Sequence, residues 1–434
     1  CLAIKSLLFK HAILKNEIHG IGISYQMHGL VLIDSEGKVL RNAIIWCDSR
    51  AVSIGEKALQ EIGRDNCSSR LLNAPGNFTA SKLKWVKDHE PKLYGKIHKA
   101  MLPGDYIAYK LSNNIRTTIS GLSEGIFWDF KDQKVAEWLL TYYDLTIDHL
   151  PELVPTFGLQ GKVCAKAAEE TGLSVDTPIM YRAGDQPNNA LTLNVFNPGE
   201  IAMTGGTSGV IYAISNKTES REISKINNFA HLNYTLQNPV LGKLLCINGA
   251  GIQYRWLREN LKFTSYEEMN TLAEKVAIGS DGMVLLPFGN GAERMLNNKN
   301  IGSKILNIDL NSHTKAHICR ATLEGIAFAF VYGMEIIMAE GLQTKVLRAG
   351  NDTLFQSKVI ANTLCTLLGF PSELYNTTGA VGAARACALE NGDFKDFGET
   401  QLKNDNIHTF YPYKDSKPYL EAYQQWKELL EKEL

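Results

Sequence analysis

The chain has 434 residues, of which 44% are hydrophobic and 21% are charged, and its formal net charge is -1. This length exceeds one ordinary core and predicts two domains of roughly 200 residues each, with the composition of a soluble globular protein. Because no block of Lys and Arg interrupts the near-zero charge, neither nucleic acid nor an anionic membrane is an expected partner.

The cysteines and the opening segment both predict a cytoplasmic protein. The eight cysteines are scattered, which favours buried thiols in a reducing compartment over disulfides or a zinc site. No signal peptide is visible, because residues 1–14 place apolar side chains at helical spacing and interrupt them with Lys5 and Lys10. The chain begins with Cys1 inside this helical pattern, which is typical of a fragment.

The first part of the chain has a mixed α/β pattern. Residues 18–24, 30–34 and 39–46 are predicted strands, and a turn at residues 34–37 joins the last two. Helical patterns follow at residues 50–63, 79–89 and 104–111, and a short helix ends at Gly172. Residues 177–185 then form a buried strand, and the next helix has Pro187 near its first turn.

The pattern changes at Asn197-Pro198-Gly199, and we place a domain boundary between residues 197 and 198. The second part opens with a hairpin whose strands are residues 201–203 and 210–214. Residues 321–339 contain two glutamates, which favours a core helix over a membrane span. Residues 345–350 form a strand that feeds a helix from about Asp352, and a later helix of small residues ends at Gly392.

The turn of this hairpin, Gly205 to Ser208, is the sharpest local feature. Consecutive glycines let the backbone approach an anion, and turn N–H groups with Thr and Ser hydroxyls can cradle a phosphate. A P-loop is excluded, because the turn joins two strands and no Lys follows it. The alternative is a flexible hairpin turn without a ligand.

Three other segments place polar groups where α/β proteins bind ligands. Asp185 ends a buried strand just before a helix, which suits a catalytic carboxylate, with a helix N-cap as the alternative. Gly350 and Asn351 end another strand, a natural place for ribose or phosphate oxygens or else an ordinary loop. His28 belongs to a Gln-Met-His-Gly run that interrupts an apolar strand. A core histidine is usually only a packing residue, so His28 alone indicates little.

Together these segments resemble the FGGY family of carbohydrate kinases, and within it the branch that acts on xylulose. The resemblance runs from about residue 18 to the last helix through the segments GISYQMHGLVLID, IIWCDSRA, NFTASKLKWVKDHEP, RAGDQPNNA, MTGGTSGV, HICRATLEGIAF, RAGND and ELYNTTGAVGAARACAL. It implies an α/β protein of two actin-like, ribonuclease H-like domains, residues 1–197 and 198–434. Sugar and ATP would bind in the cleft between the two domains.

The resemblance also implies an activity, the ATP-dependent phosphorylation of D-xylulose to D-xylulose 5-phosphate with Mg²⁺, and Asp185 would be the general base. The residues implied to contact the sugar are Gln26, Met27, His28, Asp48, Arg50 and Asp185. The residues implied to contact ATP are Gly205, Gly206, Thr207, Ser208, Gly350 and Asn351. The metal ligands are unassigned, and a homodimer is compatible with the resemblance.

Several residues depart from the family pattern. Gln186 stands where Asn is usual, Asn77 replaces a small or aromatic residue, and Asp309-Leu310 replaces Gly and an aliphatic residue. The family's opening hairpin, which reads like Asp-x-Gly-Thr-Ser and contacts phosphate and magnesium, is not in the chain. We therefore expect this chain to bind D-xylulose but to transfer phosphate poorly. The alternatives are a kinase of glycerol, gluconate or ribulose, and a non-catalytic sugar-binding relic.

Overall fold

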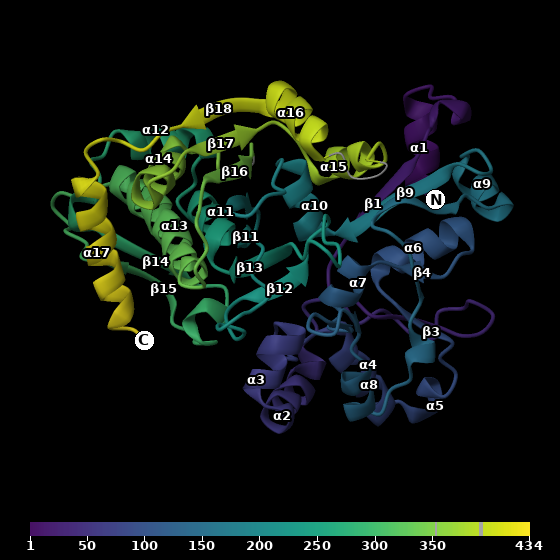
Figure 1. The fold of residues 1–434 in the computed structure, drawn as a ribbon. Helices are drawn as coiled ribbons and strands as arrows, with labels where there is room; N and C mark the ends of the chain where they lie inside the picture. Colours follow the sequence, from purple (N-terminus) through teal and green to yellow (C-terminus); the bar gives the residue numbers. More distant parts are fainter. Residues whose placement is uncertain (352–353, 390–393) are drawn as a thin grey trace.

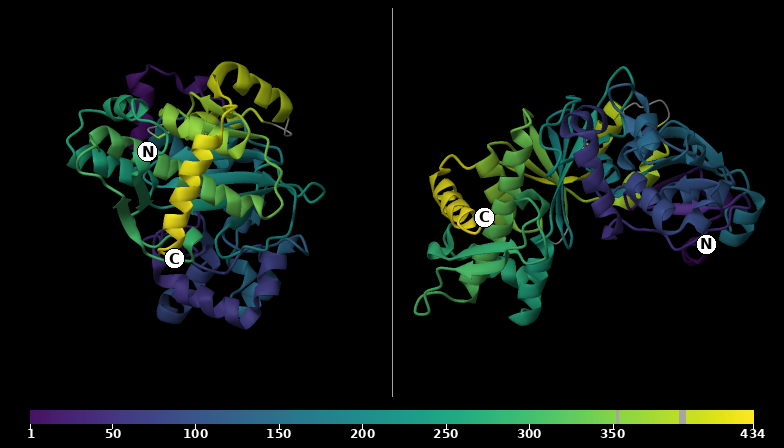
Figure 2. Two further views of the ribbon diagram at one scale, coloured as in Figure 1. Left: turned by 90° about the vertical axis from the view of Figure 1, so that its left-hand side faces the viewer. Right: turned by 90° about the horizontal axis from the view of Figure 1, so that it is seen from below.

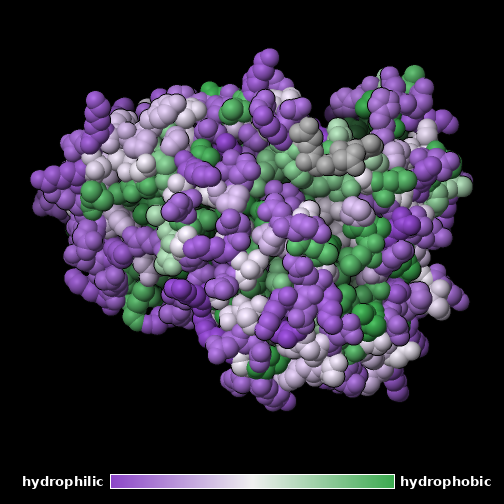
Figure 3. Space-filling model, viewed as in Figure 1, coloured by the Kyte–Doolittle hydropathy of each residue, from purple (hydrophilic) through white to green (hydrophobic). Residues whose placement is uncertain are grey.

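The computed structural model describes residues 1–351, 354–389 and 394–434. The chain folds into two lobes, which lie side by side in Figure 1 and separate clearly in the right-hand view of Figure 2. The N-terminal lobe contains a three-stranded sheet of order β1-β9-β8, and the C-terminal lobe contains a seven-stranded sheet of order β12-β13-β11-β10-β16-β17-β18. Figure 3 shows polar residues over most of one face, interrupted by smaller apolar patches.

The N-terminal sheet brings two distant segments of the chain together. Its central strand β9 (Pro178–Gly184) pairs parallel with β1 (Ile21–Tyr25) and antiparallel with β8 (Phe157–Lys162). Tyr25 lies opposite Gly184, so β1 and β9 end at the same edge of the sheet. The segments that follow the two strands therefore meet at this edge, where open α/β sheets bind their ligands.

Short helices and two-stranded ribbons surround this sheet. They are α1 (Leu2–Lys10), β2 (Val31–Ile33), α2 (Val52–Ile62), α3 (Arg64–Asn66), α4 (Thr79–His89), α5 (Pro91–Tyr94), β3 (Lys99–Met101), α6 (Pro103–Ser112), β4 (Arg116–Thr117), α7 (Ile119–Glu124), β5 (Trp128–Asp129), β6 (Lys134–Val135), α8 (Glu137–Tyr142), β7 (Glu152–Leu153), α9 (Ala165–Thr171) and α10 (Asp185–Thr192). The predicted helices at residues 50–63, 79–89 and 104–111 correspond to α2, α4 and α6 and are confirmed within two residues at each end.

The predicted strand at residues 39–46 is wrong. This segment makes only isolated bridges, from Val39 to Ile33 and from Ile44 to Leu30. Val39 and Trp46 are 43% and 60% exposed, so their apolar side chains find no core to cover. A strand pattern counts apolar residues, but it does not show whether a neighbouring strand exists to pair with them.

The C-terminal sheet places the predicted hairpin beside a parallel strand. Strands β10 (Glu200–Gly205) and β11 (Gly209–Ser215) form the hairpin, which confirms its prediction. Strand β16 (Val346–Gly350) pairs parallel with β10, and Met203 lies opposite Ala349. The end of β16 therefore lies next to the hairpin turn.

The remaining elements of the C-terminal lobe flank this sheet. They are β12 (Asn227–Ala230), β13 (Leu241–Ile247), α11 (Ala250–Asn260), α12 (Tyr266–Glu274), β14 (Val284–Phe288), β15 (Gly302–Leu306), α13 (Lys315–Met338), α14 (Lys358–Leu368), β17 (Ser372–Tyr375), α15 (Gly379–Ala386), α16 (Phe394–Asp405), β18 (Asn406–Phe410) and α17 (Lys417–Glu431). Within the described ranges, α13 is the one helix long and apolar enough to cross a membrane. Its most apolar window is 78% buried inside the protein, which confirms the predicted core helix.

Two boundaries predicted for the last helices can be compared only in part. The helix expected from about Asp352 is α14, which begins at Lys358, and Asp352 itself lies outside the described residues. The small-residue helix is α15, whose described helical part ends at Ala386, while Gly392 lies outside the described residues.

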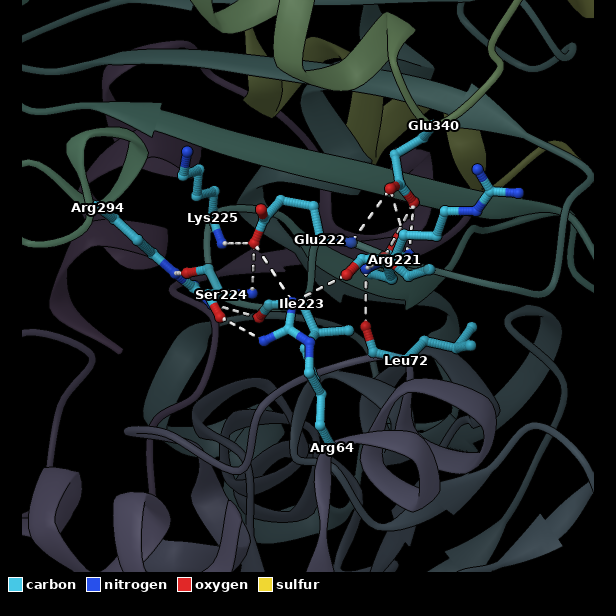
Figure 4. A network of polar contacts seen from close by, with 11 residues as sticks. Arg64, Leu72, Arg221, Glu222, Ile223, Ser224, Lys225, Arg294 and Glu340 are labelled. Atoms are coloured by element: carbon cyan, nitrogen blue, oxygen red, sulfur yellow. Dashed lines mark hydrogen bonds and ion pairs between the residues drawn. The ribbon is translucent and has the colours of Figure 1, made fainter. Parts of the chain in front are cut away.

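The domain boundary predicted between residues 197 and 198 lies in the connection at residues 193–199 and stays a prediction. Hydrogen bonds between the lobes join them at other points as well. Asn228 donates its backbone N–H to Oδ1 of Asn73 at 2.8 Å, and Asn73 donates in return to the Asn228 carbonyl at 2.7 Å. Figure 4 shows the neighbouring contacts, in which Arg64 of the N-terminal lobe donates to the Arg221 carbonyl at 2.9 Å. Glu340 receives the backbone N–H groups of this segment from the other side.

Candidate active site

The ends of β1 and β9 bring the predicted sugar-contacting residues together. Gln26, Met27 and His28 follow β1, and Asp185 follows β9 as the first residue of α10. The backbone N–H of Met27 donates a hydrogen bond to the Asp185 carboxylate. The Met27 side chain is only 5% exposed and belongs to the core, so its described contact with the site is made by its backbone.

His28 is held from three directions. Its backbone has a φ of 61°, a left-handed conformation that is uncommon outside glycine and often found at functional sites. Its carbonyl accepts a hydrogen bond from Nζ of the buried Lys82 at 2.8 Å. Its ring packs against Phe78 and Phe229, with ring centroids 5.0 Å and 5.3 Å away. The imidazole is therefore fixed before any ligand binds.

The hydrogen bonding of His28 also determines its tautomer. Nδ1 lies 2.8 Å from the Glu124 carbonyl oxygen, which can only accept, so Nδ1 carries the proton. Burial lowers the pKa of His28 to about 3, so the ring is neutral near neutral pH. Nε2 is therefore an unprotonated hydrogen-bond acceptor, as binding a sugar hydroxyl requires.

Asp185 has the environment of a general base. Burial raises its pKa above the usual value for an aspartate. Hydrogen bonds from its neighbours oppose this shift, including one from Nε2 of Gln186 at 3.1 Å and one from the Met27 backbone. These donors stabilise the carboxylate form, so Asp185 can be ionised and still be basic enough to accept a proton.

Asp48 and Arg50 pair with each other at the rim of this site. Nε and Nη2 of Arg50 lie 2.8 Å and 2.7 Å from the two Asp48 carboxylate oxygens, and the guanidinium lies 4.6 Å from the Trp85 ring centroid. Burial lowers the pKa of Lys82 to about 8, and the nearby Asp48 carboxylate opposes this shift. Asp48 thus supports the lysine that holds His28, and Asn77 donates to the Asp48 carbonyl at 2.5 Å.

The predicted phosphate turn lies against the N-terminus of α11. The Ile252 N–H donates to the Thr207 carbonyl at 2.8 Å, and a Cβ added at Gly251 would lie only 1.7 Å from the Gly206 carbonyl oxygen. A Cβ at Gly206 would meet no atom within 4 Å, so the outer side of the turn is open. An open turn beside a helix N-terminus can bind a phosphate group.

The predicted adenosine-side residues lie beside this turn. Gly350 ends β16, and the Asn351 N–H donates to the Tyr375 carbonyl at 2.8 Å. The Leu354 side chain packs against Gly205 of the hairpin turn, because a Cβ added at Gly205 would lie 2.9 Å from it. The structure therefore brings the hairpin turn and the end of β16 into contact.

Cys246 is a buried thiol on β13 that the charge of Asp185 reaches. Burial raises the pKa of this thiol to about 11, and the Asp185 carboxylate adds to that rise. Cys246 pairs with Val210, which directly follows the turn and Gly209, in the ladder of β11 and β13. That the candidate base and the candidate phosphate turn form one site stays a prediction.

Four contributions to this site were not predicted as site residues. They are the Glu124 carbonyl, the Lys82 ammonium, the Phe229 ring and the N-terminus of α11. One of them carries a sequence signal: Asn248-Gly249 directly precedes α11, and Gly251 lies in its first turn. In the described part of the chain no three His, Cys, Asp or Glu side chains form a group that could hold a metal ion, so magnesium ligands stay unassigned.

Comparison with known proteins places this fold and site in a family. Residues 2–192 match the FGGY family of carbohydrate kinases, N-terminal domain. The xylulose kinase of Haemophilus influenzae is 28% identical over 422 residues, which cover 95% of this chain and 84% of that protein. The xylulose kinase of Bacillus subtilis is 29% identical over 398 residues, which cover 88% and 76% respectively. The crystal structure of xylulose kinase from Rhodospirillum rubrum matches with a TM-score of 0.83 at 25% identity, covering 95% of this chain and 84% of that one.

The two-lobed fold is that of a carbohydrate kinase. The N-terminal part of the chain matches the N-terminal domain of the FGGY family, and the chain is similar to xylulose kinases over most of its length. The predicted fold class, α/β with two actin-like, ribonuclease H-like domains around a cleft, is confirmed by this structural match.

Proposed function

We propose that the protein is a xylulokinase, which transfers the γ-phosphoryl group of ATP to D-xylulose and gives D-xylulose 5-phosphate and ADP. The similarity to xylulose kinases over 95% of the chain supports this substrate. The observation that carries the proposal is the meeting of His28 and Asp185 at the paired ends of β1 and β9.

His28 binds the sugar in this proposal. Its Nε2 accepts a hydrogen bond from one sugar hydroxyl, because Nδ1 is committed to the Glu124 carbonyl. Lys82 keeps the His28 backbone in place, so little ordering is left to occur upon binding. A site built to satisfy a hydroxyl discriminates strongly against molecules that lack one there.

Asp185 accepts the proton of the terminal hydroxyl. The hydroxyl oxygen attacks the γ-phosphorus of ATP, the bond from that phosphorus to the bridging oxygen of ADP breaks, and the proton moves to Asp185 and then to solvent. Phosphoryl transfer depends mostly on positioning and charge neutralisation, so the base need not be strong.

The hairpin turn from Gly205 to Ser208 holds the ATP phosphates, and Gly350 with Asn351 flanks the adenosine. Magnesium would neutralise phosphate charge when bound with ATP, but the described residues form no cluster for it, so no step is derived through it. The reaction belongs to sugar metabolism in the cytoplasm, which the scattered cysteines favour.

An ADP-release assay over a panel of D-xylulose, D-ribulose, gluconate and glycerol tests the substrate. We expect the highest kcat/KM with D-xylulose. A higher value for another member of the panel would reassign the substrate. Calorimetric binding of D-xylulose without ADP release would instead favour the sugar-binding relic.

Asp185→Asn tests the base. We expect turnover to fall by about 10²- to 10⁴-fold, the usual contribution of a general base, because the amide cannot take the proton. The affinity for D-xylulose, measured by calorimetry, should stay within a few-fold, because the amide keeps the shape of the site. Asp48→Asn is the matched control and should reduce turnover far less. A fast Asp185→Asn enzyme would remove Asp185 from the mechanism.

A further inference from the structure

Glu124, the last residue of α7, is a buried carboxyl group that forms no salt bridge in the described part of the chain. It is 1% exposed, and the Tyr25 hydroxyl and the His28 backbone N–H act on it as hydrogen-bond donors. Neither donor meets a carboxyl oxygen in good hydrogen-bond geometry, and a buried carboxyl group so weakly paired calls for an explanation. The Glu124 backbone already serves the site, because its carbonyl fixes the tautomer of His28.

The Glu124 carboxyl group lies against the residue that precedes the candidate base. A Cβ added at Gly184 would lie 2.5 Å from Oε2 of Glu124 and 2.6 Å from the Met27 side chain. Gly184 is the last residue of β9, and Asp185 follows it. Glu124 thus contacts both strand ends that carry the candidate sugar site.

The groups around Glu124 are acids, hydroxyls and a neutral imidazole. Those whose charge or hydrogen bonding is coupled to Glu124 are Tyr25 on β1, His28 after β1, Asp105 on α6, Asp185 on α10 and Tyr212 on β11. Arg182 on β9, a cation that acts on Tyr25, is paired with Asp105 at 3.2 Å and with Oε1 of Gln160 at 2.9 Å. Glu124 therefore has no cation to balance a negative charge.

Of the two acids at the strand ends, Glu124 is the one whose surroundings favour the protonated form. Burial raises the pKa of Glu124 well above its usual value, and the charges of Asp105 and Asp185 add to the rise. The Tyr25 hydroxyl and the His28 backbone N–H oppose this rise at Glu124, as Gln186 and the Met27 backbone do at Asp185, but the pKa of Glu124 stays well above its usual value. When two neighbouring acids have such different surroundings, one keeps the proton and the other is the base.

We propose that Glu124 is a positioning residue that works as an uncharged carboxylic acid: it packs against Gly184 to fix the end of β9, and by keeping its own proton it adds no second negative charge to that of Asp185 beside the sugar. The inference rests on the proposed function, because it assigns Asp185 as the base. It adds a residue that binds neither substrate and yet sets the charge of the site.

The pH dependence of turnover should reflect the ionisation of Glu124. Ionised Glu124 would add a negative charge beside Asp185 and the incoming ATP phosphates, which oppose each other already. The turnover of the wild-type enzyme should therefore fall as Glu124 ionises, whereas Glu124→Gln should stay active to higher pH. Lys82, whose pKa is about 8, contributes a titration of its own, but it is present in both proteins and its effect cancels in the comparison.

The first test compares Glu124→Gln with Glu124→Ala. Glutamine copies the size and neutrality of the protonated acid, so kcat and kcat/KM should stay within about threefold of wild type. Alanine removes the contact with Gly184, so kcat should fall roughly 10- to 100-fold with the KM for D-xylulose little changed. A loss of about 100-fold or more in Glu124→Gln would show that an ionised Glu124 is needed, and would overturn the proposal.

The second test observes the proton directly, by carbon-13 NMR of protein labelled at the glutamate side-chain carboxyl carbon. The Glu124 signal, assigned by its loss in Glu124→Gln, should stay at the position of a protonated acid through neutral pH. Glu293 is the internal comparison: it is also fully buried, but it accepts the Asn248 and Gly249 N–H groups, and its pKa of about 7 predicts a visible titration. An ionised Glu124 signal at pH 7 would overturn the proposal.

The NMR test also separates this inference from the proposed function. If the chain phosphorylates no sugar in the panel, the proposed function fails, while the NMR signal still decides the state of Glu124. If the chain is an active xylulokinase and Glu124 is ionised, the inference alone fails.

Discussion

At the scale of single residues, His28 shows how one side chain can be prepared for a ligand by its surroundings. The Lys82 ammonium fixes its backbone, the Glu124 carbonyl fixes its proton, and Phe78 and Phe229 fix its ring. Each of these contacts removes a freedom that would otherwise be lost on binding. The left-handed backbone conformation of His28 is unfavourable by itself, and these several contacts together stabilise it.

His28→Ala should weaken sugar binding while leaving catalysis in the saturated enzyme much less affected. One buried hydrogen bond to a sugar hydroxyl is lost, which corresponds to about 1–3 kcal/mol, or roughly 5- to 150-fold in affinity. The measurement is the D-xylulose dissociation constant from calorimetry. His231→Ala is the control, because it removes another buried histidine whose described partner is the Tyr212 hydroxyl. An unchanged affinity in His28→Ala would leave His28 as a packing residue.

The candidate site could be predicted from sequence where the signal is local. Asp185 and His28 stand out because each breaks an apolar pattern at a strand end. Glu124 and Phe229 could not be assigned in that way. Glu124 lies 96 positions along the chain from His28, and their contact depends on how α7 packs, which periodicity does not specify. A residue used through its backbone carbonyl leaves no mark in its side-chain type.

At the scale of secondary structure elements, the fit between α11 and the hairpin turn determines the shape of the phosphate side. Gly251 allows the helix N-terminus to reach the Gly206 carbonyl, and the Ile252 N–H then bonds to Thr207. Glu293 accepts the Asn248 and Gly249 N–H groups just before the helix, which orients its first turn. The N-terminus of α11 is therefore fixed from both sides.

Gly251→Ala should disrupt this fit. The added Cβ would lie 1.7 Å from the Gly206 carbonyl oxygen, so the helix or the turn must move. Overpacking of this kind costs typically 1–3 kcal/mol of stability, and we expect ATP affinity to fall about tenfold or more. The measurement is ATP binding by calorimetry, with D-xylulose binding measured beside it. Nucleotide affinity equal to wild type would show that the turn does not hold the phosphates.

Gly95→Ala is the matched control for this prediction. It makes the same chemical change at the end of α5, where the added Cβ would lie 3.7 Å from the Pro91 carbonyl, at ordinary contact distance. It should leave both affinities unchanged. A similar loss in Gly95→Ala would show that the effect of Gly251→Ala is not specific to the turn.

Helices and strands could be predicted where the apolar periodicity and the turn residues that bound it agree. The hairpin of β10 and β11 has two apolar strands around a run of glycines, and the structure confirms it. Residues 39–46 have the apolar residues but no continuous partner strand, so the same reasoning failed there. Pairing is decided by distant segments, and a local pattern does not contain them.

At the scale of the whole molecule, the two lobes share more than the cleft between them. Helix α15 of the C-terminal part packs against β1 and α10 of the N-terminal lobe, so the chain returns to the first sheet near its end. On the other side, residues 220–230 join the lobes through polar contacts, and Phe229 of this segment reaches the His28 ring. The length of the chain predicted two domains, but not that segments far apart in sequence would join them.

Asn228→Ala should weaken this joint. The side chain of Asn228 donates to the Leu72 carbonyl at 2.7 Å and to the Ser220 hydroxyl at 3.1 Å, and it accepts from Nζ of Lys243 at 2.9 Å. Removing it leaves buried partners unpaired, so the free energy of unfolding should fall by at least about 1–3 kcal/mol. Urea denaturation measures the change, and the exposed Asn42→Ala is the control. An effect no larger than that of Asn42→Ala would mean that water replaces these bonds.

Acid should weaken the same joint through His231, which follows β12. Burial lowers the pKa of His231 to about 3, so the folded protein keeps this ring neutral while the unfolded chain binds a proton below about 6.5. The contribution of His231 to the free energy of unfolding is therefore full above pH 6.5 and is lost as the pH falls toward 3. The loss is about 1.4 kcal/mol for each pH unit.

His231→Asn removes this titration and isolates it from that of the other groups. The stability of the variant relative to wild type should rise by about 2 kcal/mol between pH 6.5 and pH 5, because only the wild type loses stability through His231. Denaturant titrations of both proteins at several pH values measure the difference, and the exposed His89→Asn should show no such trend. Parallel pH curves for wild type and His231→Asn would mean that His231 is protonated in the folded protein, and that acid acts elsewhere than at this joint.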